Sequence, residues 1–216
     1  MAQPGLRRMQ QECVQFFDAL WAGDQRPLVF GDGLEKEPVL MLIGEAPGEQ
    51  EALEGKPFVG RAGRNLNTFL ECLGLSREEI YLSNVVKLRP TKTSASGRTS
   101  NRPPTKEELE LFVPWLMREI ALIQPRALVT LGNVALRAFL HGESIGKCHG
   151  KWHQAVVRPP QVAAMTLPLF ALYHPASVIY RAELKETYMR DLEVLRESLQ
   201  VRGEKLQVAC FKFSGN

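Results

Sequence analysis

Four short apolar runs stand out along the chain and predict the strands of a buried sheet. They occupy residues 39–43, 80–86, 126–131 and 168–173, and the first, Val-Leu-Met-Leu-Ile, contains no polar position. A continuous apolar run of this length is typical of a parallel strand that is covered on both faces. We therefore expect a central four-stranded, mostly parallel sheet.

The stretches between these runs carry apolar residues at helical spacing. The predicted helices cover residues 8–22, 61–73, 106–123, 133–140 and 182–199. Gly74 and Thr105 are typical end and start signals for the second and third helices, whereas Pro114 should kink or break the third. Strands that alternate with helices predict an α/β fold, a three-layer α/β/α sandwich.

The remaining segments complete the predicted organisation. We expect one domain over residues 1–200 and leave the structure of the tail, residues 201–216, open. Residues 90–104 combine proline, serine, threonine and glycine with basic side chains, which predicts a mobile surface loop. We expect residues 141–160 to form a loop, in which an antiparallel strand could also occur.

Composition narrows the class of protein. The chain has 216 residues and a net charge of +3, which is too mild to indicate nucleic-acid binding by itself. Residues 87–106 carry six cations and no acid, and Arg61 and Arg64 form a second basic cluster; such clusters either neutralise phosphates or face solvent. No run is long enough to span a membrane and no signal peptide is visible, so we expect a cytoplasmic protein without membrane contact. The four cysteines are far apart, which argues against a disulfide framework and a simple zinc site.

Polar clusters follow three of the predicted strands. Residues 45–51 hold three carboxylates, Asn84 lies near the end of the second run, and His174 follows the fourth. Because the carboxyl ends of parallel strands share one edge of a sheet, we expect these groups to meet there. Phe58, in a segment rich in glycine and proline, is either a lid over the core or a platform for a ligand.

This set of side chains suits recognition of one nucleobase. The amide of Asn84 offers an acceptor and a donor on one edge, so it can pair with an N3–H and an O4 together and, if held in orientation, would reject cytosine. An aromatic ring stacks on a base with about 1–3 kcal/mol. A histidine can donate to O2, where negative charge grows when a glycosidic bond breaks. Enzymes that cleave this bond flip the base out of the duplex.

Several motifs resemble those of the family-four uracil-DNA glycosylases. They are Gly-Glu-Ala-Pro-Gly at 44–48, Gly-Lys-Pro-Phe-Val-Gly-Arg-Ala-Gly at 55–63, Ser-Asn-Val-Val-Lys at 83–87, Asn-Arg at 101–102 and His-Pro-Ala-Ser at 174–177. They occur in order over roughly residues 38–195. The resemblance implies a four-stranded parallel sheet and hydrolysis of the N-glycosidic bond of deoxyuridine in DNA.

The resemblance also implies roles in the base pocket. Phe58 would stack on uracil, Asn84 would read N3–H and O4, and His174 would stabilise the O2 anion. Glu51 would fill the space beside C5 and disfavour thymine. Glu45 would lie near the sugar, to orient water or stabilise an oxocarbenium ion.

Further residues are assigned to the DNA strand by the same resemblance. The turn at 175–177 would press on the backbone, and Val178, Ile179 or Tyr180 would wedge into the space that the flipped base leaves. The residues expected to contact phosphates or the strand are Arg61, Arg64, Lys87, Asn101, Arg102 and Ser177.

The sequence departs from the family at its iron–sulfur cluster. The family usually ligates a four-iron, four-sulfur cluster with four cysteines, but two of those positions hold Leu88 and, by count, Leu111. Near the N-terminus only Cys13 can match. Leucine cannot ligate iron, so we predict no cluster and no other cofactor, with Phe16 or Phe17 packing against the leucines instead.

Two further departures bear on mechanism. The stretch 91–100 is longer than usual, and it lacks the histidine by which a related branch becomes covalently trapped on DNA, so trapping is not expected. Ala46 lines the pocket where other branches place Asp or Asn to activate water, which leaves the general base undefined.

These observations predict a monomeric, monofunctional uracil-DNA glycosylase whose partner is DNA containing uracil or another deaminated base. Two alternatives stay open. The pocket could serve hypoxanthine or xanthine instead of uracil, or the chain could be a catalytically inactive DNA-binding homologue.

Overall fold

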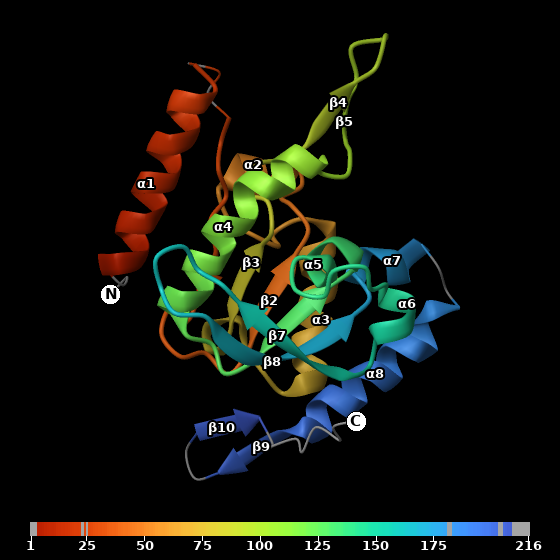
Figure 1. The fold of residues 1–216 in the computed structure, drawn as a ribbon. Coiled ribbons are helices and arrows are strands. Elements are labelled where there is room, and N and C mark those ends of the chain that lie inside the picture. The colour runs from red at the N-terminus through yellow and green to blue at the C-terminus, as the bar shows by residue number, and fades with distance from the viewer. Residues whose placement is uncertain (1–3, 23, 25, 181–182, 203–204, 209–216) are drawn as a thin grey trace.

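The computed structural model describes residues 4–22, 24, 26–180, 183–202 and 205–208. These residues form a six-stranded sheet in the order β1-β3-β2-β6-β8-β7 (Figure 1). The strands are β1 (Asp32–Gly33), β2 (Met41–Gly44), β3 (Tyr81–Asn84), β6 (Leu128–Leu131), β7 (Trp152–Val157) and β8 (Met165–Leu172).

The four inner strands of this sheet, β3, β2, β6 and β8, are parallel and correspond to the four predicted runs. Each edge adds one antiparallel strand, β1 beside β3 and β7 beside β8. The expected strand count was therefore short by two, and the antiparallel strand within 141–160 is β7.

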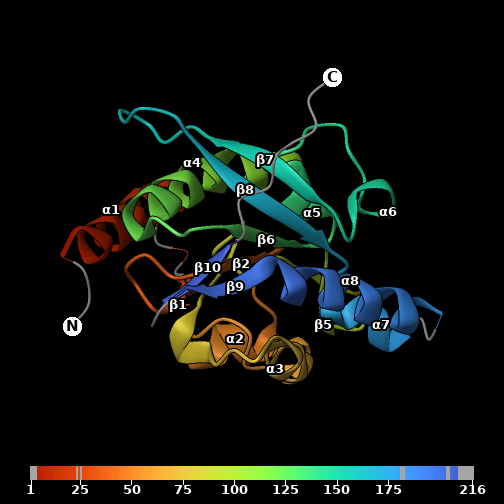
Figure 2. The ribbon, with the colours of Figure 1, turned by 90° about the horizontal axis from the view of Figure 1, so that it is seen from below.

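Helices cover both faces of the sheet, which confirms the three-layer α/β/α sandwich (Figure 2). Helices α1, α4, α5 and α6 supply buried side chains to one apolar cluster, and α3 and α8 supply them to the other. The helices are α1 (Pro4–Leu20), α2 (Glu49–Glu54), α3 (Arg61–Leu73), α4 (Lys106–Ile123), α5 (Asn133–Arg137), α6 (Ile145–Cys148), α7 (Pro175–Tyr180) and α8 (Leu184–Ser198), with a 3₁₀ turn at Arg77–Glu79.

Strand β2 shows how the two clusters are separated. Successive side chains of a strand point to opposite faces. Met41 and Ile43 accordingly pack in the cluster of α1 and α4, and Leu42 packs in the cluster of α3 and α8. All three are fully buried, so the sheet is covered on both sides, as the unbroken apolar run predicted.

Helix boundaries follow the predicted signals in most places. Helices α3 and α4 have the expected bounds, whereas α1 begins earlier, at Pro4, and α5 ends at Arg137. Helix α4 continues through Pro114 without the expected break. Pro114 is exposed there, so water can bond to the carbonyl that loses its helical partner.

Residues 91–101 are ordered differently from the expected mobile loop. They form an antiparallel hairpin of β4 (Thr91–Thr93) and β5 (Thr99–Asn101) that projects from the body of the molecule (Figure 1). Beyond α8, β9 (Leu199–Arg202) and β10 (Lys205–Val208) form a second hairpin that begins before the predicted tail, 201–216, and extends into it. The rest of that tail, residues 209–216, lies outside the described residues. None of the described helices is both long enough and apolar enough to cross a membrane.

Candidate functional site

A pocket of about 550 Å³ lies where the carboxyl ends of the inner strands meet. It brings together predicted residues from five separate segments of the chain, as parallel strand topology requires. The predicted residues that line it are Ala46, Glu51, Phe58, Arg61, Arg64, Asn84, Asn101 and His174.

The last residue of β2, Gly44, makes room for the two groups expected to hold a base. Gly44 pairs in register with Asn84 on β3. A Cβ atom at Gly44 would lie 2.4 Å from Asn84 Oδ1 and 2.7 Å from Phe58 Cζ. The amide and the ring therefore share the space beside the end of this strand, and only glycine leaves that space open.

The amide of Asn84 is available for a ligand. Asn84 is 4% exposed, and its side chain has no hydrogen-bond partner within the described part of the chain. The amide lines the pocket and is not among the described buried side-chain atoms that lack a hydrogen-bond partner. Its donor and acceptor therefore open onto the pocket, where the edge of a base can replace water.

The backbone of Phe58 is held in an unusual conformation. Its φ is +55°, in the left-handed region that bulky residues avoid. Arg77 Nη2 donates to the Phe58 carbonyl at 2.6 Å, and a Cβ atom at Gly63 would collide with that oxygen. Arg77 thus holds the aromatic wall in place, and nothing in the sequence around the 3₁₀ turn marks it for this role.

His174 presents one defined tautomer. Its Nδ1 accepts a hydrogen bond from the backbone N–H of Ala176 at 3.2 Å, which leaves the proton on Nε2. Burial lowers the pKa of His174 to about 4, so the ring is neutral near pH 7. A neutral imidazole with Nε2–H free is a hydrogen-bond donor in the pocket.

The two carboxylates expected here differ in position. Glu51 is buried and accepts from the backbone N–H groups of Gly48 (3.1 Å) and Gly60 (2.8 Å), so it joins two walls of the pocket. Glu45 lies outside the lining, is half-buried, and has its pKa raised by burial.

Arginine and asparagine side chains surround the mouth. Arg61 and Arg64 are exposed on the first turn of α3, and Asn101 accepts from Arg89 Nε at 2.7 Å. Arg102 instead makes a bidentate pair with Glu108, both bonds being 2.7 Å, and closes the base of the β4–β5 hairpin.

Helix α7 carries the residues that were expected to meet the backbone and fill the duplex. Ser177 is half-buried, with its backbone N–H bonded to the carbonyl of His174 at 2.8 Å. Val178 packs in part against the cluster of α3 and α8. The side chains of Ile179 and Tyr180 lie outside what the structure describes.

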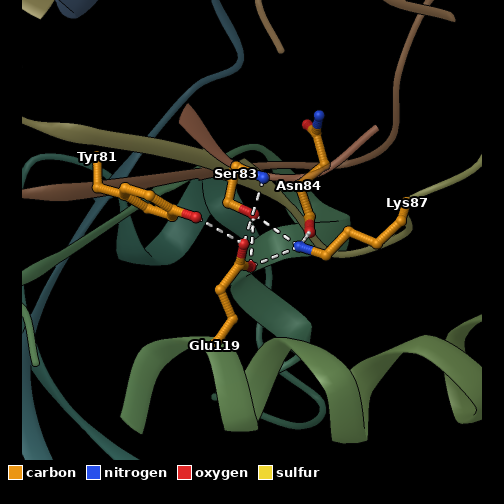
Figure 3. Close-up of polar contacts among 6 residues, drawn as sticks. Tyr81, Ser83, Asn84, Lys87 and Glu119 are labelled. Carbon is orange, nitrogen blue, oxygen red and sulfur yellow. Dashed lines mark hydrogen bonds and ion pairs between the residues drawn. The ribbon is translucent and has the colours of Figure 1, made fainter. Parts of the chain in front are cut away.

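The expected phosphate contact of Lys87 is wrong. Lys87 is 1% exposed, and its Nζ lies 2.6 Å from Glu119 Oε2 beneath the end of β3 (Figure 3). A cation that is buried and paired in this way cannot reach a phosphate on the surface.

The residues at the family's cluster positions form apolar packing. Leu88, Cys13 and Phe17 are buried in one cluster, and Leu111 packs against it, whereas Phe16 is 43% exposed. Burial raises the pKa of the Cys13 thiol to about 12. Iron–sulfur clusters are held by thiolates, and one buried thiol with two leucines does not fit a four-cysteine set. Among the described residues, no group of three or more His, Cys, Asp or Glu side chains is placed to hold a metal ion.

The carboxyl edge of the parallel sheet thus brings an aromatic ring, an amide and a neutral imidazole into one pocket, which is the set of groups expected to recognise a planar base. The chain belongs to the uracil DNA glycosylase superfamily, whose family model matches residues 30–193.

Several curated relatives are similar to this chain in sequence over most of its length. The chain is 36% identical over 175 residues to the Type-4 uracil-DNA glycosylase of Saccharolobus solfataricus, covering 78% of this chain and 74% of the relative. It is 36% identical over 172 residues to that of Archaeoglobus fulgidus, covering 77% and 79%. It is 32% identical over 180 residues to that of Thermotoga maritima, covering 82% and 85%.

Proposed function

We propose that this enzyme hydrolyses the N-glycosidic bond of deoxyuridine in DNA, releasing uracil and leaving an abasic site. The observation that carries the proposal is the unpaired Asn84 amide beside the Phe58 ring. The ring would stack on the flipped base while the amide pairs with N3–H and O4. Glu51, held between two backbone amides, would narrow the space beside C5 against the methyl group of thymine.

In this proposal the neutral His174 side chain provides the main electrostatic stabilisation of the transition state. As the C1′–N1 bond breaks, its electron pair passes to the base and negative charge grows at O2, where Nε2–H would donate. Water then provides hydroxide to C1′, and its proton returns to N1 of uracil. Glu45 is our candidate for holding that water, because a carboxyl group with a raised pKa is the stronger base.

A product assay tests the proposal directly. Free uracil is measured from a single deoxyuridine in single-stranded DNA and in a duplex, with hypoxanthine and xanthine substrates beside it. We expect uracil release, weakened uracil selection in Asn84→Asp, and slower cleavage in His174→Ala. If excess enzyme releases uracil from neither substrate, the proposal is wrong; release of hypoxanthine or xanthine alone would assign the pocket to another base.

We also propose that the enzyme works without an iron–sulfur cluster, as a monomer in the cytoplasm. The apolar packing of Leu88 and Leu111 supports the absence of a cluster. The described pocket is lined by residues of one chain, which supports a monomer. Iron analysis of anaerobically purified protein should find far less than one iron per chain, and light scattering should give the mass of one chain. Four irons per chain, or a dimer mass, would contradict the respective point.

A further inference from the structure

The ion pair between Lys87 and Glu119 is fully buried and fully hydrogen-bonded. The Nζ group of Lys87 donates to Glu119 Oε2 (2.6 Å), to Ser83 Oγ (2.6 Å) and to the backbone carbonyl of Asn84 (2.8 Å). Glu119 in turn accepts from Tyr81 Oη (3.0 Å), Ser83 Oγ (2.7 Å) and the backbone N–H of Gly31 (3.3 Å). The ammonium group thus has three acceptors, and Figure 3 shows these contacts meeting at Lys87 Nζ and the Glu119 carboxylate.

This network fixes the peptide group that follows Asn84. Its carbonyl oxygen accepts from Lys87, and its N–H, which belongs to Val85, donates to the carbonyl of Gly44 at 3.0 Å. A peptide group is planar. Holding it at both ends therefore fixes the rotation about the Cα–C bond of Asn84, and with it the direction from which the amide enters the pocket.

Stability alone is a weak explanation for such a pair. Desolvation of two buried charges offsets their attraction, and an apolar pair of similar volume is often as stable. The geometry shows a more specific feature. One of the hydrogen bonds of the Lys87 ammonium group goes to the backbone carbonyl of Asn84, the residue that would pair with the base. Glu119 holds the ammonium group in the position from which it makes that bond.

We infer that Lys87 and Glu119 are positioning residues that orient the Asn84 amide and so set the selection of uracil. This inference rests on the proposed function, since it concerns the same pocket. It replaces the expected phosphate contact of Lys87 by an action through the peptide backbone. The pair acts on the base-reading edge and leaves the binding of the DNA strand unchanged.

Two duplexes separate contacts to the base from contacts to the strand. One carries a 2′-fluorinated deoxyuridine that resists hydrolysis, and the other carries a tetrahydrofuran abasic analogue at the same place. Lys87→Met keeps the length of the side chain but removes the donor to Asn84. We expect this variant to bind the first duplex about tenfold more weakly, the scale of one hydrogen bond, and to bind the second as the wild type does. Uracil release under single turnover should fall by a similar factor.

Lys87→Met leaves Glu119 buried without its counter-ion, which can prevent folding. A second variant therefore repeats the test without a buried unpaired charge. The double variant Lys87→Met/Glu119→Gln is neutral at this place and should show the same selective loss. Ile120→Val is the matched control, since it trims a fully buried side chain next to Glu119 on α4. It should lower thermal stability slightly and leave both affinities unchanged.

The outcomes distinguish this inference from the proposed function. Wild-type affinity of Lys87→Met and of the double variant for both duplexes would overturn the inference, as would an equal loss in Ile120→Val or a loss on the abasic duplex as large as on the first. Failure of the proposed function looks different: the wild type itself would release no uracil and would not prefer the deoxyuridine duplex.

Discussion

A single methyl group at the end of β2 should disable the base pocket. In Gly44→Ala the added Cβ would stand 2.4 Å from Asn84 Oδ1 and 2.7 Å from Phe58 Cζ, closer than real Cβ contacts allow. The backbone cannot give way easily, because Asn84 is paired with Gly44 in the sheet and bonded to Lys87. The amide and the ring must therefore move.

The loss of activity in Gly44→Ala can be estimated from the binding energy that the Phe58 ring and the Asn84 amide would contribute. Displacing the ring loses stacking of about 1–3 kcal/mol, and tilting the amide loses about 1 kcal/mol for one hydrogen bond. The sum, roughly 2–4 kcal/mol, corresponds to a fall in kcat/KM of about 30- to 1000-fold, at ~1.36 kcal/mol per factor of ten. Overpacking should also cost about 1–3 kcal/mol of folding stability.

The assay is uracil release from a deoxyuridine oligonucleotide, with thermal unfolding measured on the same protein. Gly74→Ala is the control, because Gly74 has φ +68° but no atom lies within 4 Å of the place that a Cβ atom would take there. It should lose about 1 kcal/mol of stability through backbone strain and keep full activity. If Gly44→Ala cleaves within threefold of the wild type, the ring and the amide are not held together as described.

Three further predictions concern other parts of the site. Arg77→Met removes the donor to the Phe58 carbonyl and should lower kcat/KM about tenfold, the scale of one charged hydrogen bond; unchanged steady-state rates would contradict this. Burial lowers the pKa of His174 from 6.5 to about 4. As the pH falls, the imidazole is therefore protonated in the unfolded chain at a higher pH than in the folded protein. Folding stability in urea should therefore fall as pH drops from about 6.5 to about 4, and less so in His174→Gln. Lys92→Ser and Arg98→Ser should each reduce the slope of log K against log salt by about 0.9 for DNA binding.

The core of the sheet and the pocket could be predicted because they depend on strong patterns. Fully buried parallel strands appear as unbroken apolar runs, and parallel topology sends Asn84 and His174 to one edge whatever the details of packing. The edge strands could not be found in this way. Strand β1 has two residues, and β7 is partly exposed and interrupted by polar residues, so neither stands out from a loop.

Positioning residues escaped prediction because their partners are distant in sequence. Lys87 stands in a basic segment and looks like a surface cation, but its counter-ion, Glu119, lies on α4, which reads simply as an amphipathic helix. Arg77 acts on Phe58, 19 residues earlier, from an unremarkable turn. Neither spacing nor composition carries information about such long-range pairs, which exist only once the helices pack on the sheet.

The same reasoning decides which cations of residues 87–106 can meet DNA. Four of the six cations are ion-paired: Lys87 with Glu119, Arg89 with Glu49, Arg102 with Glu108 and Lys106 with Glu110. The other two, Lys92 and Arg98, are exposed on the β4–β5 hairpin and form no ion pair with any described residue.

The hairpin therefore carries the two cations of this segment that form no ion pair with a described residue, and we expect their removal to change the salt dependence most. Arg102→Ser should instead loosen the base of the hairpin by breaking its pair with Glu108, and so lower thermal stability. If the salt slope falls in Arg102→Ser but not in Lys92→Ser or Arg98→Ser, ion pairing does not determine which of these cations meets the strand.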